Sequence, residues 1–205
     1  MPRGTYLVND RPEAFSCAPG PAGWRYVSDR LDLAVDAAFT VVRFAVREGR
    51  DGAAWARGGR TTIDDGQRLL TWTCSADEVI ERVSTAMSLD AESPGSLVAL
   101  LRAVGRPGKA PVRKRVAVVR FTPPSFAGLE ARYGIARLDA ERHDAPDGLL
   151  LVERWNVDDL DAGTRLVVHL AGDVVVAAEG STASGEMHVE VRSLESPPTG
   201  AGGTA

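Results

Sequence analysis

The amino-acid sequence predicts a mainly β fold, an antiparallel closed or half-open β-barrel with one or two helices at a mouth. Three observations lead to this prediction. Short segments rich in β-branched and aromatic residues recur roughly every ten residues, separated by Gly, Pro or Asp turns. The chain lacks the strand–helix alternation of parallel sheets. A sheet of about ten antiparallel strands has to protect its edges by closing or curling.

The composition indicates one folded domain of ordinary kind. Of the 205 residues, 44% are hydrophobic and 25% are charged, which is enough apolar material for a core. The formal net charge of -4 gives no global positive field to attract nucleic acid. No apolar run approaches the roughly 20 residues of a membrane span, and the N-terminal stretch MPRGTYLVNDRPEAF lacks the apolar region of a secretory signal. We therefore expect a cytoplasmic protein with no nucleic-acid and no membrane partner.

The two ends of the chain are expected to lie outside the barrel. Residues 1–23 are rich in proline and glycine, which favours an extended N-terminal arm with one short strand around Tyr6 to Val8. The single β-barrel domain then spans residues 24–195. The tail at 196–205, SPPTGAGGTA, has nothing to bury and is expected to be disordered.

The first half of the predicted domain is a four-stranded meander. In its first segment Leu31, Leu33 and Val35 alternate with polar residues, as in a strand with one buried face. In the second segment Phe44 and Val46 share a face, and the short linker between the two makes them antiparallel neighbours. The four predicted strands lie at residues 24–36, 39–47, 53–63 and 67–73.

A helix separates the two halves. Ser93 as N-cap, Pro94 in the first turn and Gly105 as terminator predict a helix over 94–104. Residues 76–88 are either a second helix or a strand, because a capping-box pattern at Ser75 precedes valines and threonines that also suit a strand. Six further strands are expected at residues 112–121, 129–138, 149–157, 164–170, 174–179 and 186–194.

Motifs of known catalytic chemistry are absent from the sequence. It contains no G-x-S-x-G, G-x-G-x-x-G, G-x-x-x-x-G-K-[ST], H-E-x-x-H or C-x-x-C pattern. Cys17 and Cys74 lie far apart and are read as two reduced thiols, and the three histidines are too scattered to propose a metal site. We therefore expect no cofactor and no metal, and we assign no catalytic residue.

Five side chains form the predicted ligand-binding site. Four of them are aromatic residues in the middle of four different strands, namely Phe44, Trp72, Tyr133 and Trp155. Such residues are either ordinary core or the wall of a cavity for an elongated apolar ligand. The fifth is His169, which faces the interior if the opposite face of its strand packs outward against the helices, and is otherwise exposed. In an enzyme, His169, Glu153 or Tyr133 would be the acid or base inside the cavity.

Three stretches of the chain carry a resemblance to a known group of proteins. They are YLVNDRPEAFSCAPGPAGWRYVSDRLDLAVD, SPGSLVALLRAVG and WNVDDLDAGTRLVVHLAGDVVV. Together they resemble the small accessory β-barrel proteins of enediyne polyketide biosynthesis in actinobacteria, and more distantly half-barrel lipoprotein carriers and putative glycolipid-binding proteins. The resemblance covers residues 6 to 194 and implies a dimeric cytoplasmic barrel with a long apolar cavity. Unlike the lipoprotein carriers, the protein is expected to carry no signal peptide and no lipidation cysteine.

Three functions are compatible with this sequence. The first is a non-catalytic protein that binds an elongated hydrophobic small molecule, a fatty-acid-like or polyene polyketide intermediate, in the barrel cavity. The second is a cofactor-free cyclase or isomerase that uses the same cavity with one acid or base. The third is a packed scaffold that binds no ligand. The first is preferred, with a homodimer as the expected assembly.

Overall fold

The computed structural model describes residues 2–20, 23–48, 54–63, 65–75, 81–106, 111–145 and 148–195. These residues form fifteen strands and one helix. The helix is α1 (Pro94–Val104), as the sequence predicts. The strands of the first half are β1 (Arg3–Val8), β2 (Arg11–Gly20), β3 (Gly23–Ser28), β4 (Leu31–Asp36), β5 (Val41–Arg47), β6 (Trp55–Thr62), β7 (Arg68–Cys74) and β8 (Arg82–Ser84). Those of the second half are β9 (Ser88–Asp90), β10 (Arg113–Arg120), β11 (Leu129–Ala145), β12 (Gly148–Asp159), β13 (Thr164–Ala171), β14 (Val174–Thr182) and β15 (Gly185–Glu195).

All of the strands belong to one sheet that follows the order of the chain almost throughout. The order is β8-β7-β6-β5-β4-β3-β2-β1-β15-β14-β13-β12-β11-β10-β9, and only the β9–β10 pair is parallel. The mainly β, antiparallel prediction is therefore confirmed. No ladder joins β8 to β9 in the described part of the chain, so the sheet has two edges and a closed barrel is not confirmed.

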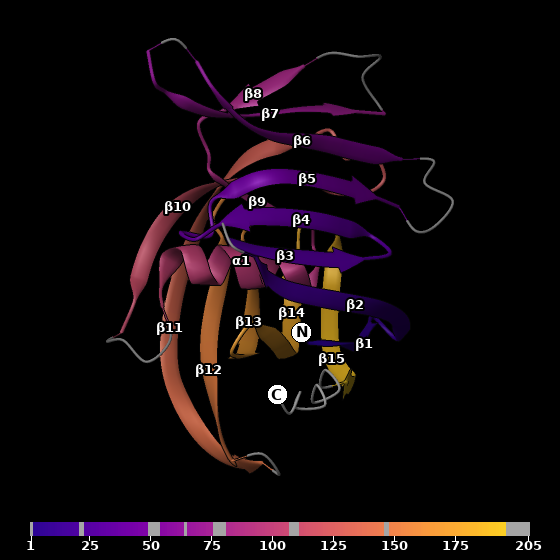
Figure 1. Cartoon of the computed structure of the whole chain (residues 1–205), viewed down its shortest axis with the longest axis vertical. Coiled ribbons are helices and arrows are strands. Elements are labelled where there is room, and N and C mark those ends of the chain that lie inside the picture. Colours follow the sequence, from indigo (N-terminus) through magenta and orange to yellow (C-terminus); the bar gives the residue numbers. More distant parts are fainter. Residues whose placement is uncertain are drawn as a thin grey trace, which may run out of the picture.

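The sheet curls into two layers that enclose α1. Figure 1 shows β2 to β8 running across the front and β10 to β15 running crosswise behind them, with α1 between the layers. The helix contacts β4 in front, β14 behind and the short strand β9. Ten of its residues are buried, including Gly95 and Arg102. The predicted helix thus exists, but it lies inside the curled sheet rather than at a mouth. None of the helical structure in the described ranges is long and apolar enough to cross a membrane.

The expected N-terminal arm is instead part of the sheet. β1 pairs with both β2 and β15, and β2 pairs with β3. The prolines of β2 fit because Pro12 and Pro19 lie near the two ends of that strand, where the loss of an N–H group is tolerated. Between them, Glu13, Phe15 and Cys17 alternate toward the interior. The expected tail at 196–205 lies outside the described residues.

The single strand predicted at 24–36 is a hairpin of two strands. Trp24 and Tyr26 are the buried aromatic residues of β3, whereas Leu31, Leu33 and Val35 are the buried residues of β4. The two-residue connection between the strands switches the buried face from even to odd positions. For residues 76–88 the sequence left helix and strand as alternatives. The described part of this segment contains strand β8 and the start of β9, and residues 76–80 lie outside the described ranges.

Candidate binding site

The structure brings Phe44 and Trp72, but not Tyr133 and Trp155, to the lining of a common pocket. Phe44 and Trp72 meet on either side of Phe121, with ring centroids 4.8 and 5.7 Å from that ring. The indole nitrogen of Trp72 donates to the carbonyl oxygen of Ala127 at 3.0 Å. All three rings are at most 4% exposed, so this group is packed core.

Tyr133 and Trp155 lie in two other places. The Tyr133 hydroxyl donates to Asp90 Oδ2 at 2.7 Å, and Trp155 lies under the guanidinium of Arg137, 5.5 Å from its ring centroid. His169 is half-buried and points away from the core, because the buried face of β13 is the opposite one. The leucine-rich face of β13 packs inward, so His169 does not face the interior.

The hollow described between the layers beside α1 is small. The hollow beside α1 that touches Leu97, Tyr133, Leu166 and Met187 has a volume of about 20 Å³. That space is close to the size of one water molecule. In this structure α1 and its neighbours fill the space around that hollow. The interior site for an elongated ligand stays a prediction.

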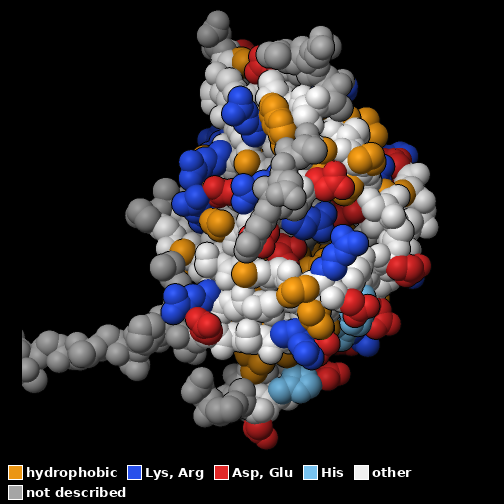
Figure 2. Space-filling model, turned by 90° about the vertical axis from the view of Figure 1, so that its right-hand side faces the viewer, with side chains coloured by type: hydrophobic (Ala, Val, Ile, Leu, Met, Phe, Trp, Pro, Cys, Tyr) orange, Lys and Arg blue, Asp and Glu red, His pale blue; other side chains and the backbone are white. Residues whose placement is uncertain are grey.

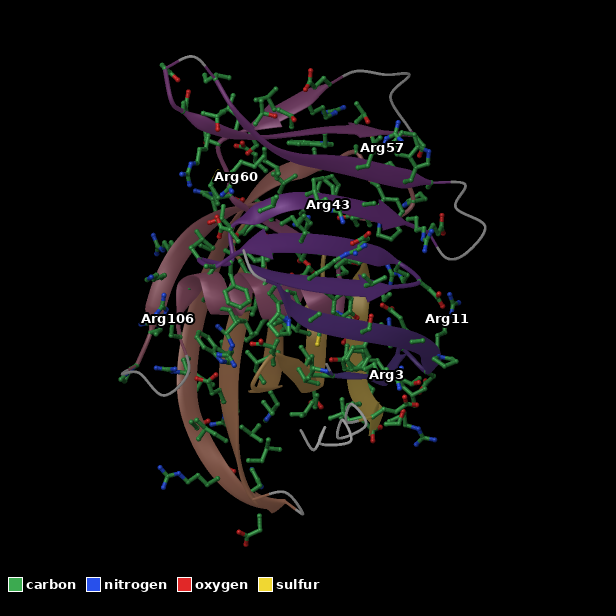
Figure 3. The ribbon with its side chains drawn as sticks, viewed as in Figure 1. Arg3, Arg11, Arg43, Arg57, Arg60 and Arg106 are labelled. Atoms are coloured by element: carbon green, nitrogen blue, oxygen red, sulfur yellow. The ribbon has the colours of Figure 1, made fainter. Side chains whose placement is uncertain are left out.

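A larger pocket opens at the end of the sheet where the β1–β2 and β3–β4 turns lie. We call it the end pocket; its volume is about 640 Å³ and it is lined by Val8, Arg11, Pro12, Glu13, Asp29, Arg30, Glu48 and Pro123. Figure 2 views this end of the molecule and shows basic and acidic side chains side by side across its middle. In Figure 3, Arg11 lies at the same end, on the right. A pocket of this size suits a small organic ligand.

Glu13 is the buried acid of the end pocket. It lies in β2 on the inward face, directly across from Tyr6 in β1, and is only 5% exposed. Its Oε1 atom is buried and receives no hydrogen bond from the described residues. Burial raises the pKa of the Glu13 carboxyl above its usual range, and the Ser28 hydroxyl and, to a smaller degree, the charge of Arg30 oppose that rise. A buried oxygen of this kind costs free energy unless a ligand or water supplies the missing partner.

The hydroxyl groups around Glu13 lie at the first turn of α1. Ser28 and Tyr26 are close enough to the Glu13 carboxyl to affect its pKa. The Tyr26 ring packs directly on Gly95, where a Cβ atom would collide with it. Tyr26 OH is also buried without a hydrogen-bond partner in the described structure, and burial raises its pKa well above the usual value. The fold therefore places the Glu13 carboxyl and the Tyr26 phenol close together among aromatic side chains.

A second polar group lies beside the N-terminus of α1. Asp90, the last residue of β9, accepts hydrogen bonds from Tyr133 Oη, from Ser96 Oγ at 3.3 Å and from the backbone N–H of Glu92 at 2.8 Å. Burial raises the pKa of Asp90 and of Tyr133. Arg120 pairs with Asp159 nearby. Because each of these groups is paired, the cluster is a structural anchor for the helix rather than an open site.

The C-terminal end of α1 carries a buried ion network. Arg102 donates to Glu153 Oε2 at 2.5 Å and Arg137 donates to Glu153 Oε1 at 2.7 Å. Arg102 also donates to the Gly172 carbonyl and lies 3.5 Å from Asp173 Oδ1. Both Glu153 oxygens therefore have a partner. Sequence reasoning considered Glu153 as an acid or base, and its surroundings assign it to the core.

The alternation of β2 is the signal that could have found Glu13. The run Glu13, Phe15 and Cys17 shows period two, but the flanking prolines and glycines favoured an arm instead. Among the residues that the structure describes, no three or more His, Cys, Asp or Glu side chains come together as a metal-ion site.

Comparisons with known proteins place this chain in no family. No family model matches it, and no curated protein matches it. Among solved structures, a DUF1089 family protein from Pseudomonas aeruginosa is similar at 15% sequence identity, with a TM-score of 0.42. The match covers 80% of this chain and 81% of that protein. A similarity at this level carries no argument about fold or function.

Proposed function

We propose that the protein binds a small amphiphilic molecule in the end pocket, with a carboxylate or carbonyl head directed at Glu13. The observation that carries this proposal is Glu13, which lines a pocket of about 640 Å³ and whose buried Oε1 lacks a hydrogen-bond partner among the described residues. A ligand that completes this hydrogen bond removes the cost of leaving the buried atom unpaired.

The surroundings favour a ligand head that accepts hydrogen bonds. Arg11 and Arg30 are donors only, and a Glu13 carboxyl with a raised pKa is the more readily protonated, so that it can donate as well. The side chains of Val8, Pro12 and Pro123 supply an apolar wall for the rest of the molecule. The fatty-acid-like or polyketide class expected from the sequence fits this chemistry, but at the end of the sheet rather than in its interior.

Isothermal titration calorimetry with octanoate, decanoate and dodecanoate tests the proposal. We expect affinity to rise by about fourfold per buried methylene until the apolar wall is covered. Arg30→Gln should weaken binding at least tenfold, whereas Arg165→Gln, an exposed arginine paired with Asp158, should leave it unchanged. Equal affinities along the series, or equal losses in both variants, would contradict a built pocket and favour the packed-scaffold interpretation.

The pH dependence of binding tests the assigned role of Glu13. As the pH rises through the raised pKa of Glu13, the carboxyl loses the proton that it donates to a carboxylate, and the wild type should bind decanoate more weakly. Glu13→Gln keeps a donor and nearly the same shape but cannot ionise. Its affinity should therefore stay constant over the same pH range. A wild type whose affinity does not change with pH would rule out Glu13 as the partner of the ligand head.

A cofactor-free isomerase or cyclase is the second candidate, and Glu13 again favours it. Its ionised carboxylate could take a proton from the carbon next to a ligand carbonyl, and the acid so formed could return that proton to another carbon. Tyr26 would be the nearest phenol to the developing enolate oxygen. Exchange of the acidic protons of an acetoacetyl thioester into D₂O, followed by NMR, should be accelerated by the wild type and not by Glu13→Gln.

We also keep the homodimer as a proposal. Figure 1 shows the β11–β12 hairpin extending beyond the rest of the molecule. Leu138 and Leu150 on this hairpin are 45% and 40% exposed, and a projecting two-stranded ribbon is poorly stable alone in water. Sedimentation velocity at micromolar concentration should show a dimer that Leu150→Asp dissociates. A monomer in the wild type would end this proposal. The cytoplasmic location stays a prediction.

A further inference from the structure

The outer face of the front layer carries a groove that the end pocket does not touch. The groove crosses β4 to β7 and has a volume of about 460 Å³. Its polar side chains are Asp32, Arg43, Arg57, Thr71, Thr73 and Glu81. Figure 3 places Arg43 and Arg57 on β5 and β6 of this layer.

The strand register explains why this face is hollowed. Across the sheet, Arg43 lies opposite Gly59, and Gly59 lies opposite Thr71. In the adjacent row Ala45 lies opposite Arg57, and Arg57 lies opposite Thr73. Each arginine therefore has a small residue beside it on the neighbouring strand. Gly59 cannot easily gain a side chain, since a Cβ atom there would come within 2.7 Å of the Val42 carbonyl oxygen.

The two arginines bring positive charge into the groove without an acidic partner of their own. Within the described ranges, Arg43 makes no ion pair, and the recorded contact of Arg57 is a cation–π contact with Trp55 at 5.1 Å. Two acids also line the groove. Asp32 on β4 is held by two hydrogen bonds from Arg25, at 3.0 and 2.8 Å, and Glu81 lies directly before β8. The register makes Arg43 and Arg57 diagonal neighbours on one face, about 7 Å apart at the backbone, where like charges repel.

We propose that this groove binds the phosphoryl group of a small phosphate monoester. Guanidinium groups bind phosphate oxygens through paired, charge-assisted hydrogen bonds, and a dianion between two arginines removes their repulsion. The Thr73 hydroxyl on β7 supplies a further donor, whereas the Thr71 hydroxyl already donates to the Gly59 carbonyl oxygen at 3.4 Å. The site lies on the outer face of the sheet and Glu13 on the inner face, so this proposal is independent of ligand binding at the end pocket.

NMR titration of the arginine Nε–Hε signals with phenyl phosphate at constant ionic strength tests the groove. We expect saturable shifts of Arg43 and Arg57 with a common dissociation constant. Arg43→Gln and Arg57→Gln should each weaken binding at least tenfold. Asp32→Asn removes a negative charge and releases Arg25, so it should strengthen binding several-fold. Drift without saturation, or shifts of one arginine alone, would overturn the proposal.

Two controls separate this site from other sources of binding. Arg115 on β10 is an exposed arginine of the back layer, and Arg115→Gln should bind phenyl phosphate as the wild type does. If this variant lost as much affinity as the groove variants, the loss would follow from the change in net charge alone. Glu13→Gln should also leave the titration unchanged, which keeps this test separate from that of the end pocket. Binding to phosphatidate vesicles without binding of phenyl phosphate would overturn the assignment to a small monoester.

Discussion

Two buried glutamates lie at opposite ends of α1 and differ in one respect. Glu153, near the C-terminal turn, is 1% exposed and both of its oxygens accept hydrogen bonds from arginines. Glu13, near the N-terminal turn, is 5% exposed and its Oε1 has no partner in the described structure. The residue type is the same and both side chains are buried, so neither property distinguishes a core residue from a site residue. The distinguishing property is whether the surrounding chain completes the hydrogen bonds.

The largest expected effect is at the paired glutamate. Glu153→Ala leaves Arg102 and Arg137 buried with no carboxylate between them, and removing one partner of a buried ion pair costs about 3–5 kcal/mol. Urea denaturation should show this loss in the free energy of unfolding. A loss below about 1 kcal/mol, as for an exposed pair, would mean that water reaches the network in solution.

A smaller effect is expected at the anchor beside the same helix. Tyr133→Phe removes the hydroxyl that donates to Asp90 Oδ2 and should cost about 1–3 kcal/mol in the free energy of unfolding. The ionised carboxylate is the form that this hydroxyl stabilises. Denaturation at pH values below and above the raised pKa of Asp90 should therefore show the greater loss at the higher pH. Equal losses at both pH values would contradict a hydrogen bond to a carboxylate.

The smallest effect on stability is expected at the unpaired glutamate. Because the pKa of Glu13 is raised in the folded state, the folded protein binds the proton more tightly than the unfolded chain. Its contribution to stability is present below the usual glutamate pKa and is lost as the pH rises through the folded pKa. Glu13→Gln removes this loss.

Denaturation of the wild type and Glu13→Gln at several pH values measures this difference. The two should agree within about 1 kcal/mol at pH 4, and the variant should be the more stable at pH 8. If instead the variant is the less stable at pH 8, Glu13 has a favourable partner in the folded protein, and the comparison with Glu153 fails.

The sequence alone predicted those structural elements whose signals lie in a few neighbouring residues. The helix over 94–104 was predicted with its observed bounds, because Ser93, Pro94 and Gly105 mark its ends chemically. The hairpin of β3 and β4 was missed because its two-residue turn, Asp29 and Arg30, resembles two more positions of one alternating strand. Local periodicity does not report where the chain reverses.

The candidate site could be predicted only in part, for a physical reason. Phe44 and Trp72 were expected to converge, and they do so through Phe121, which lies far along the chain. Which face of a strand turns inward depends on the curl of the whole sheet. This curl places His169 on the outward face of β13, and the sequence of the strand alone does not show it. Glu13 was missed because the prolines and glycines near it in the sequence suggested an extended arm. In the structure these residues lie at the ends of β2, a paired strand.

The ladder between β1 and β15 has a consequence for how this protein folds. Arg3 pairs with Glu195 there, and apart from the short parallel pair of β9 and β10 the other ladders of the sheet join strands that are neighbours in the chain. The two meanders can form early from nearby residues, whereas this seam must wait for the closing of a very large loop. Until then β1 and β15 each expose a free edge to other chains. The joining of the first strand to the last is therefore the step at which a folding molecule is most exposed to aggregation.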